Sequence, residues 1–183
     1  MKNNARDNQN GQPTDSESQG NEMNNEFHQL FLDELADLLN AEMQLTKALP
    51  KMAKAAQSEE LAEAFRSHLE ETENHVNRLK EVFETLNEKV KSKTCKAMKG
   101  LVEEGSELME ELKGSSAIDA GLIAAAQKVE HYEIASYGTV RAWAEQMGHS
   151  EAVELLGETL DEEKAADEKL TEIARESANK QPA

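Results

Sequence analysis

The sequence is poor in the residues that build β-sheets, disulfide frameworks and membrane spans. Aromatic residues make up 4% of its 183 residues, there are 3 prolines, and Cys95 is the single cysteine. One cysteine excludes an internal disulfide framework and suits a reducing compartment. No apolar run is long enough to cross a bilayer. Ala, Glu, Leu and Lys dominate instead, a balance typical of helical proteins.

Positive charge is also scarce. The chain has 20 Lys and Arg residues against 37 Asp and Glu residues, so its formal net charge is −17. Such a surface repels nucleic acid and anionic lipid and attracts cations. Residues 1–10 are polar and lack the apolar core of a secretory signal. We therefore expect a cytoplasmic protein with neither nucleic-acid nor membrane partners.

The chain divides into a polar start and one helical domain. Residues 1–25 are rich in Asn, Gln, Ser, Asp and Gly, which predicts a disordered tail. From Phe27 onward, apolar residues recur at spacings of three and four, as they do in amphipathic helices. We expect a domain over 26–177 and a frayed end at 178–183. The four long helices that this pattern predicts cover about 26–56, 59–91, 117–147 and 151–176.

Local signals mark where these helices begin and end. Pro50 is expected to kink the first helix or end it early. Ser58 is a predicted N-cap for the second helix, and the Ser116–Asp119 spacing predicts a capping box for the third. Gly148 is the expected stop between the third and fourth helices.

The long connection between the second and third helices indicates the topology. Residues 92–116 contain a basic patch and then a short amphipathic stretch over 101–112. One long crossover in a four-helix bundle is typical of the ferritin-like fold. We therefore predict an all-α, ferritin-like four-helix bundle whose crossover contains a short extra helix. The alternative is a bundle of five helices in another arrangement.

Each predicted helix carries a potential metal ligand where its apolar stripe requires a hydrophobic residue. Because a helix advances about 100° per residue, the direction of each side chain follows from the sequence. These positions fall near the middle of each helix, so in an antiparallel bundle they meet in one layer. The candidate ligands are Glu42 in the first helix, Glu71 and His75 in the second, Glu130 and Glu133 in the third, and Glu163 and Asp167 in the fourth.

Buried carboxylates need positive partners, because an unpaired interior charge costs several kcal/mol. No Lys or Arg lies squarely on the four stripes, whereas two divalent cations would supply the missing charge. Carboxylate oxygens with an imidazole suit iron or manganese, with zinc as an alternative. The sequence therefore predicts two metal ions, with iron as the first choice.

Several candidates have alternative interpretations. Each acid could instead be paired with a neighbouring base. Glu71 and Glu130 lie on the flanks of their stripes, and Glu70 competes with Glu71 as the ligand. His68 is two turns from His75, which favours a histidine at the edge of the core.

Three segments resemble the YciE/YciF family of ferritin-like proteins. They are His68–Leu79, Lys128–Thr139 and Glu158–Leu170, and the resemblance covers about residues 26–175. It implies a bacterial, stress-associated, metal-binding protein with a ferritin-like fold. The wider ferritin and rubrerythrin group uses Glu-x-x-His, whereas this chain has one acid–histidine pair and one acid–acid pair, both at four-residue spacing.

Two functional hypotheses follow. The first is a di-iron oxidase or peroxidase in which O₂ or peroxide reacts at the metal pair. The second is a non-catalytic metal-binding or structural stress protein that acts through association with partners. Bundles of this class often bury a helix face against a second copy, so we also expect a homodimer.

Overall fold

Five α-helices account for almost all of the structure. The computed structural model describes the backbone of residues 15–179 and the side chains of residues 25–179. Within this part of the chain every regular element is helical. The elements are α1 (Asp15–Ala55), α2 (Glu59–Thr85), α3 (Lys96–Glu111), α4 (Ile118–Gln146), α5 (Ser150–Ile173) and a terminal π-helical turn, η1 (Ala174–Ala178).

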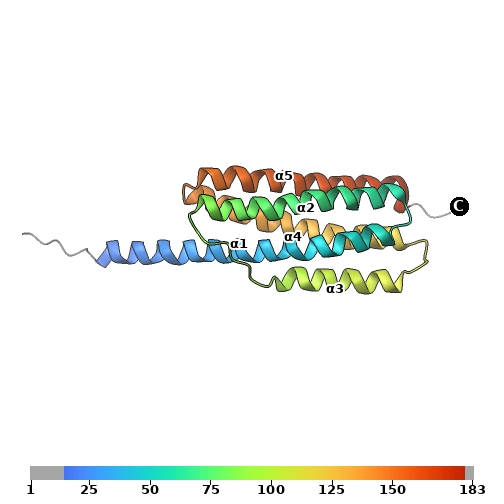
Figure 1. Cartoon of the computed structure of the whole chain (residues 1–183), viewed down its shortest axis with the longest axis horizontal. Helices are drawn as coiled ribbons and strands as arrows, with labels where there is room; N and C mark the ends of the chain where they lie inside the picture. The colour runs from blue at the N-terminus through green and yellow to red at the C-terminus, as the bar shows by residue number, and fades with distance from the viewer. Residues whose placement is uncertain (1–14, 180–183) are drawn as a thin grey trace, which may run out of the picture.

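Four of the helices form a bundle, and the fifth lies outside it (Figure 1). α1 packs against α2 and α4, and α5 packs against α2 and α4, so the four surround a common core. α3 lies in the connection between α2 and α4 and packs against α1 and α4. The predicted four-helix bundle with one long crossover and a short extra helix is therefore confirmed. No described helix is both long and apolar enough to cross a membrane.

The first helix starts earlier than predicted and continues through its proline. α1 begins at Asp15 rather than near residue 26, so residues 15–25 of the predicted tail are helical. Pro50 lies inside α1 without ending it. The rest of the predicted tail, residues 1–14, and residues 180–183 of the predicted frayed end lie outside the described residues.

α2 ends at Thr85, earlier than the predicted residue 91. Asn87 has a φ of 56°, in the left-handed region that Asn tolerates better than most residues. The N–H of Glu88 donates to the carbonyl of Phe83, and that of Asn87 to the carbonyl of Glu84. This backbone reversal satisfies the last carbonyls of the helix and turns the chain into the crossover.

The cap predicted at Ser58 is present, whereas the capping box at Ser116–Asp119 is not. The hydroxyl of Ser58 accepts the N–H of Leu61 at 3.4 Å. α4 starts at Ile118 with no side-chain cap. The Asp119 carboxylate instead accepts the N–H groups of Gln57 and Ser58, at 2.8 and 2.9 Å. Asp119 therefore makes a tertiary contact in place of the predicted local cap, and local spacing does not predict that contact.

The crossover helix also starts earlier than the predicted residue 101. Cys95 precedes α3, and its sulfur accepts the N–H of Met98 at 3.3 Å. The Cys95 backbone N–H donates to the side-chain oxygen of Asn40 on α1. Together these bonds fix the start of α3 against α1 and satisfy an otherwise free helix N-terminus.

Two hydrophobic clusters fill the bundle, with a polar layer between them. One cluster includes Leu45, Phe65 and Leu170, and the other includes Phe31, Leu79 and Leu156. Each helix of the bundle contributes to both clusters and places polar side chains at the boundary. The fully buried acids and histidine of this layer are Glu42 on α1, His75 on α2, Glu133 on α4 and Glu163 on α5.

Candidate metal centre

The polar layer contains two groups of side chains whose ligand atoms could each hold a metal ion. In each group, one donor atom per residue lies within 4.8 Å of every other donor atom. The groups share one residue, Glu163, which makes a carboxylate bridge between two ions geometrically available. The first group is His68, Glu130, Glu133 and Glu163, and the second is Glu42, His75 and Glu163.

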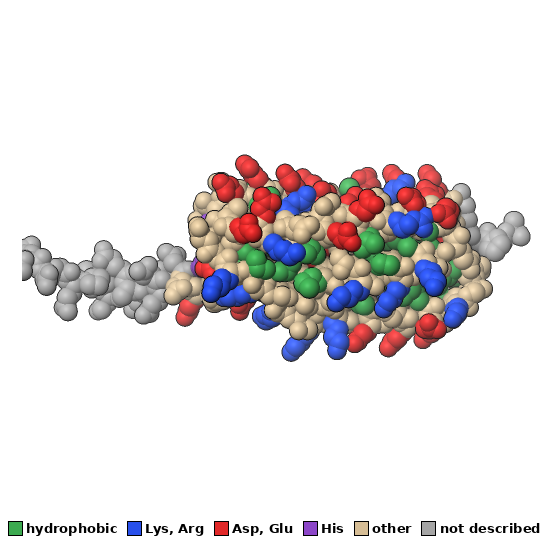
Figure 2. Space-filling model, viewed as in Figure 1, with side chains coloured by type: hydrophobic (Ala, Val, Ile, Leu, Met, Phe, Trp, Pro, Cys, Tyr) green, Lys and Arg blue, Asp and Glu red, His purple; other side chains and the backbone are tan. Residues whose placement is uncertain are grey.

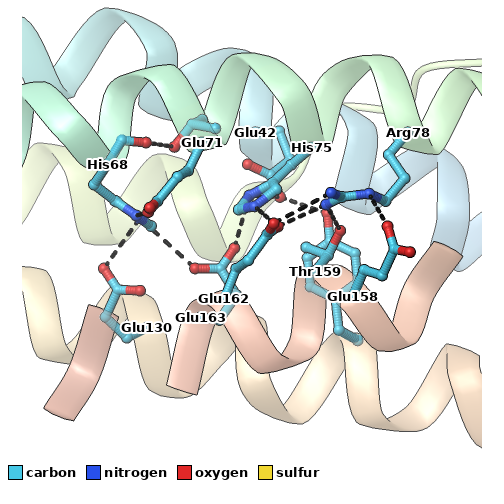
Figure 3. A network of polar contacts seen from close by, with 12 residues as sticks. Glu42, His68, Glu71, His75, Arg78, Glu130, Glu158, Thr159, Glu162 and Glu163 are labelled. Atoms are coloured by element: carbon cyan, nitrogen blue, oxygen red, sulfur yellow. Dashed lines mark hydrogen bonds and ion pairs between the residues drawn. The ribbon is translucent and has the colours of Figure 1, made fainter. Parts of the chain in front are cut away.

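Distances within the groups match those between ligands of one metal ion. In the first group, Nε2 of His68 lies 3.5 Å from Oε1 of Glu130 and 3.6 Å from Oε2 of Glu163. In the second, Nδ1 of His75 lies 3.0 Å from Oε1 of Glu163 and 3.6 Å from Oε1 of Glu42 (Figure 3). Two donor atoms about 2.1 Å from a shared ion are separated by roughly 3–4 Å, so the spacing fits.

Each residue of the two groups has at least one donor atom without a hydrogen-bond partner. Buried polar atoms in proteins are nearly always paired, so a concentration of unpaired ones calls for a ligand. All of these atoms are carboxylate oxygens or imidazole nitrogens, which are the ligands of iron, manganese and zinc. They are Oε2 of Glu42 and of Glu130, Nε2 of His68, Nδ1 of His75, and both carboxylate oxygens of Glu133 and Glu163.

The charges of the layer also fit two divalent ions. Four glutamates bring four negative charges into a region shielded from water, and neutral histidines bring none. Two divalent cations carry four positive charges, so the loaded layer would be neutral. Without such ions, the carboxylates can avoid the cost of burial only by taking up protons or by pairing with protonated histidines.

Carboxylates outside the layer orient both histidines. Nε2 of His75 lies 2.9 Å from Oε2 of Glu162, and Nδ1 of His68 lies 3.1 Å from Oε2 of Glu71. Arg78 donates to Glu162 and to the hydroxyl of Thr159, each at 2.7 Å, and so holds Glu162 in place. Each imidazole therefore turns one nitrogen into the layer, as metal-binding histidines do when a carboxylate fixes the other nitrogen.

Tyr137 fixes one of the candidate ligands on the opposite side. Its hydroxyl donates to Oε1 of Glu42 at 2.5 Å, and both side chains are fully buried. Oε2 of Glu42 is left without a partner. Burial and the charges of Glu42 and Glu163 raise the pKa of Tyr137 well above its usual value, so this hydroxyl keeps its proton at neutral pH.

The surroundings of the buried acids shift their pKa values in opposite directions. Burial, together with the neighbouring carboxylates, raises the pKa values of Glu130 and Glu133 well above the usual value, and burial also raises that of Glu42. Burial acts in the same direction on Glu163, but its contacts with His75 and His68 outweigh burial and lower its pKa. Glu163 is therefore the acid of the layer that is most readily ionised.

The same carboxylates act on the histidines. Burial lowers the pKa of an imidazole, but the negative charges of Glu130, Glu71 and Glu163 overcome it and raise the pKa of His68 to about 9. Glu163 and Glu42 do the same for His75 and raise its pKa to about 10. In the metal-free layer, both imidazoles are therefore protonated at neutral pH.

Five of the seven predicted ligands lie in the two groups. Glu42, His75, Glu130, Glu133 and Glu163 are all buried there. Glu71 and Asp167 belong to neither group. The Glu71 side chain is 44% exposed and contacts His68, while that of Asp167 is 23% exposed and accepts a hydrogen bond from Gln127 at 3.1 Å. This geometry does not favour Glu71 or Asp167 as metal ligands.

His68, predicted at the edge of the core, belongs to the first group in the structure. Its seven-residue separation from His75 spans two helical turns, so both rings lie on one face of α2. The two ring centroids are 6.3 Å apart, and one ring serves each group. The two-turn spacing of His68 and His75 is the sequence feature that indicates His68 as a ligand. Two ions placed one after the other along the bundle axis need ligands at two levels of that axis.

Comparison with known protein families identifies the chain. A family model described as Domain of unknown function (DUF892) matches residues 26–183. The protein is a member of the DUF892/YciF family. Protein YciF of Escherichia coli K12 is 51% identical to it over 152 residues, which cover 82% of this chain and 92% of YciF.

Solved structures agree with the family and the fold. The structure described as the E. coli stress protein YciF matches with a TM-score of 0.81 at 50% identity, over 85% of this chain and 98% of that one. YcfI from Rhodopseudomonas palustris matches with a TM-score of 0.77 at 46% identity, over 79% and 92%. A Xanthomonas campestris protein matches in fold, with a TM-score of 0.64 at 22% identity, over 82% and 91%. This DUF892/YciF member therefore has a ferritin-like fold.

Proposed function

We propose that this protein binds two divalent metal ions in its polar layer, first of all iron, and that the ions react with O₂ or peroxide during a stress response. The observation that carries this proposal is the pair of ligand groups that share Glu163. Manganese and zinc are the alternatives that the same donor atoms accept. The role in stress is drawn from the description of the YciF relative as a stress protein.

The chain's own residues would prepare the site in three ways. Glu163 would bridge the two ions, with His68, Glu130 and Glu133 on one side and Glu42 and His75 on the other. Glu71 and Glu162 would hold the imidazoles in the tautomers that bind metal. The hydrophobic clusters on either side of the layer would limit entry of water.

Bound iron would supply electrons for the reduction of O₂ or peroxide. The protein would contribute an ionised bridge at Glu163 and proton-bearing groups close to the ligands. Tyr137 is the nearest of these, since its hydroxyl donates to Glu42 and resists deprotonation. Glu130 and Glu133 have raised pKa values and could accept protons when the ions leave.

Metal content is the direct test of the proposal. Elemental analysis of untagged protein should find close to two ions per chain, and a Glu133→Ala/Glu163→Ala variant should lose them. Glu168 is an exposed acid on the same helix as Glu163, so Glu168→Ala is the matched control and should keep both ions. Full metal content in the double variant would contradict the proposal.

The second candidate is a non-catalytic protein in which metal stabilises the fold. The position of the layer between two hydrophobic clusters supports this role, because ions there would cross-link all four helices of the bundle. Aerobic addition of Fe²⁺ separates the two candidates. Oxidation faster than in buffer alone supports the redox protein, whereas saturable binding without oxidation supports the structural one.

The expected homodimer and the cytoplasmic location stay predictions. Analytical ultracentrifugation of the loaded protein tests the first, and fractionation of cells that express the full chain tests the second. The expected absence of nucleic-acid partners rests on the formal charge of −17.

A further inference from the structure

A cavity of about 550 Å³ lies between α2 and α5 and reaches the polar layer from one side. Its walls come mainly from these two helices. Two of its lining residues, His68 and Glu130, belong to the first ligand group, whereas Glu42, His75, Glu133 and Glu163 are absent from its lining. The cavity therefore meets one of the two candidate metal positions and leaves the other closed.

The two ligand-group residues at the inner end of this cavity carry buried polar atoms without partners. His68 is 7% exposed and Glu130 is 2% exposed, yet Nε2 of His68 and Oε2 of Glu130 have no hydrogen-bond partner. At the second position, by contrast, Glu42 and His75 are both fully buried. Glu162, held by Arg78, covers the outer nitrogen of His75 (Figure 3).

The lining of the cavity indicates which molecules it accepts. Its walls are largely apolar and include Ala64, Phe65, Ala166 and Leu170. Acids outnumber bases around it, since its lining includes Glu60, Glu63, Glu71 and Glu162 but only one lysine, Lys169, and no arginine. Its volume lies in the range of small-molecule pockets. An apolar body fits these walls, and the acidic surroundings oppose anions.

We propose that the cavity between α2 and α5 is a pocket for small uncharged or cationic organic molecules, and that it brings them to the metal position at His68 and Glu130 while the position at Glu42 and His75 stays closed. This inference rests on the proposed function, because it requires an ion at the first group. It makes the two ions unequal: one takes ligands from outside, and the other is held by protein alone.

Cobalt substitution gives a readout that does not depend on activity. The full chain is loaded with Co²⁺, its metal content is measured, and its visible absorption bands are followed during titration with 1-methylimidazole at pH 8. We expect a saturable change in these bands. Azide, which is small and negatively charged, should need a concentration at least ~10-fold higher, equivalent to about 1.4 kcal/mol.

Two variants that fill the pocket locate the binding site. Ala166→Trp on α5 and Ala64→Phe on α2 each place a ring in the cavity, and each should weaken 1-methylimidazole binding by ~10-fold or more. Ala135→Trp is the matched control, because Ala135 is exposed on α4 and does not line the cavity. It should leave the affinity unchanged. Cobalt content and helical circular dichroism confirm that each variant is folded and loaded.

The outcomes separate this inference from the proposed function. Protein that takes up no cobalt overturns both. The pocket alone is overturned if the absorption bands of the loaded protein do not change with 1-methylimidazole. It is also overturned if the two filled variants bind 1-methylimidazole with the same affinity as the control. Equal affinity for azide and 1-methylimidazole overturns the assigned ligand chemistry.

Discussion

At the scale of the residue, each candidate histidine ligand depends on a carboxylate outside the layer. Glu162 contacts the outer nitrogen of His75 at 2.9 Å, and Glu71 contacts that of His68 at 3.1 Å. These acids are partly exposed and would not themselves bind metal in this arrangement. They decide which nitrogen of each ring carries the proton and which one faces the layer.

Glu162→Ala should therefore lower metal affinity by ~10–100-fold, because His75 loses the partner that orients it. Competition with a chelator measures the change. Glu158→Ala is the control, since Glu158 contacts Arg78 at 3.4 Å and not His75. Equal affinity in the two variants would show that Glu162 does not orient the ligand.

Metal affinity should rise with pH from 6 to beyond 9. His68 and His75 have pKa values raised to about 9 and about 10, so below these values a metal ion must displace a proton from each ring. Acid favours the protonated rings and weakens binding, by about tenfold per displaced proton for each pH unit. Calorimetry in buffers with different ionisation enthalpies measures the protons released. An affinity independent of pH would contradict the protonated state assigned to these rings.

Much of the candidate site was predictable because a regular helix fixes side-chain directions. Glu42, Glu133 and Glu163 interrupt apolar stripes, and all three are fully buried. Glu71 was harder to place, since a flanking residue can turn toward solvent or toward the core. The two-turn distance between His68 and His75 predicts an edge position for His68 if there is one layer of ligands, whereas two adjacent groups need ligands at two heights.

At the scale of the element, the turn between α4 and α5 depends on a glycine. Gly148 has a φ of 78°, a conformation that costs other residues roughly 1–2 kcal/mol. Gly148→Ala should lower the free energy of unfolding by about that amount. Urea denaturation measures the loss.

Gly138 provides the matched comparison. It lies inside α4, and an added Cβ would meet nothing within 4 Å. Gly138→Ala should therefore raise the free energy of unfolding by ~0.5–1 kcal/mol, because alanine favours the helix. A lower free energy of unfolding for Gly148→Ala and a higher one for Gly138→Ala would support the role of Gly148 in the turn. A lower free energy of unfolding for both variants would contradict it.

Element boundaries were less predictable than element identity. Apolar periodicity identified four long helices, but the end of α2 depends on the left-handed Asn87 and the start of α3 on the Cys95 sulfur. Asp119 has the local spacing of a capping box, yet it bonds backbone groups of Gln57 and Ser58. Such contacts join residues far apart in sequence, so local patterns do not contain them.

At the scale of the whole molecule, acidity is the main surface property. On the face seen in Figure 2, carboxylates gather mainly along the upper and lower edges, and lysines and arginines lie between them beside small hydrophobic areas. A formal charge of −17 raises the local concentration of cations around the protein. Uptake of divalent metal should therefore be slowed by added salt, which screens this attraction.

Metal binding should stabilise the entire bundle, because ligands from α1, α2, α4 and α5 meet in one layer. A free metal concentration of 100 times the Kd adds about 2.7 kcal/mol per site. Thermal denaturation with and without metal should show a higher Tm for the loaded protein. The Glu133→Ala/Glu163→Ala variant should show no such rise, and an unchanged Tm in the parent protein would argue against ions that bridge the helices.

The polar layer also determines how the helices can slide along one another during folding. A slip of one helix by a single turn moves its side chains about 5.4 Å along the axis. In α5, such a slip would carry Glu163 out of the layer and toward the leucines of one of the hydrophobic clusters. Burying that carboxylate among leucines costs several kcal/mol. The acids and histidines thus select one axial alignment of the four helices, and they do so before any ion has bound.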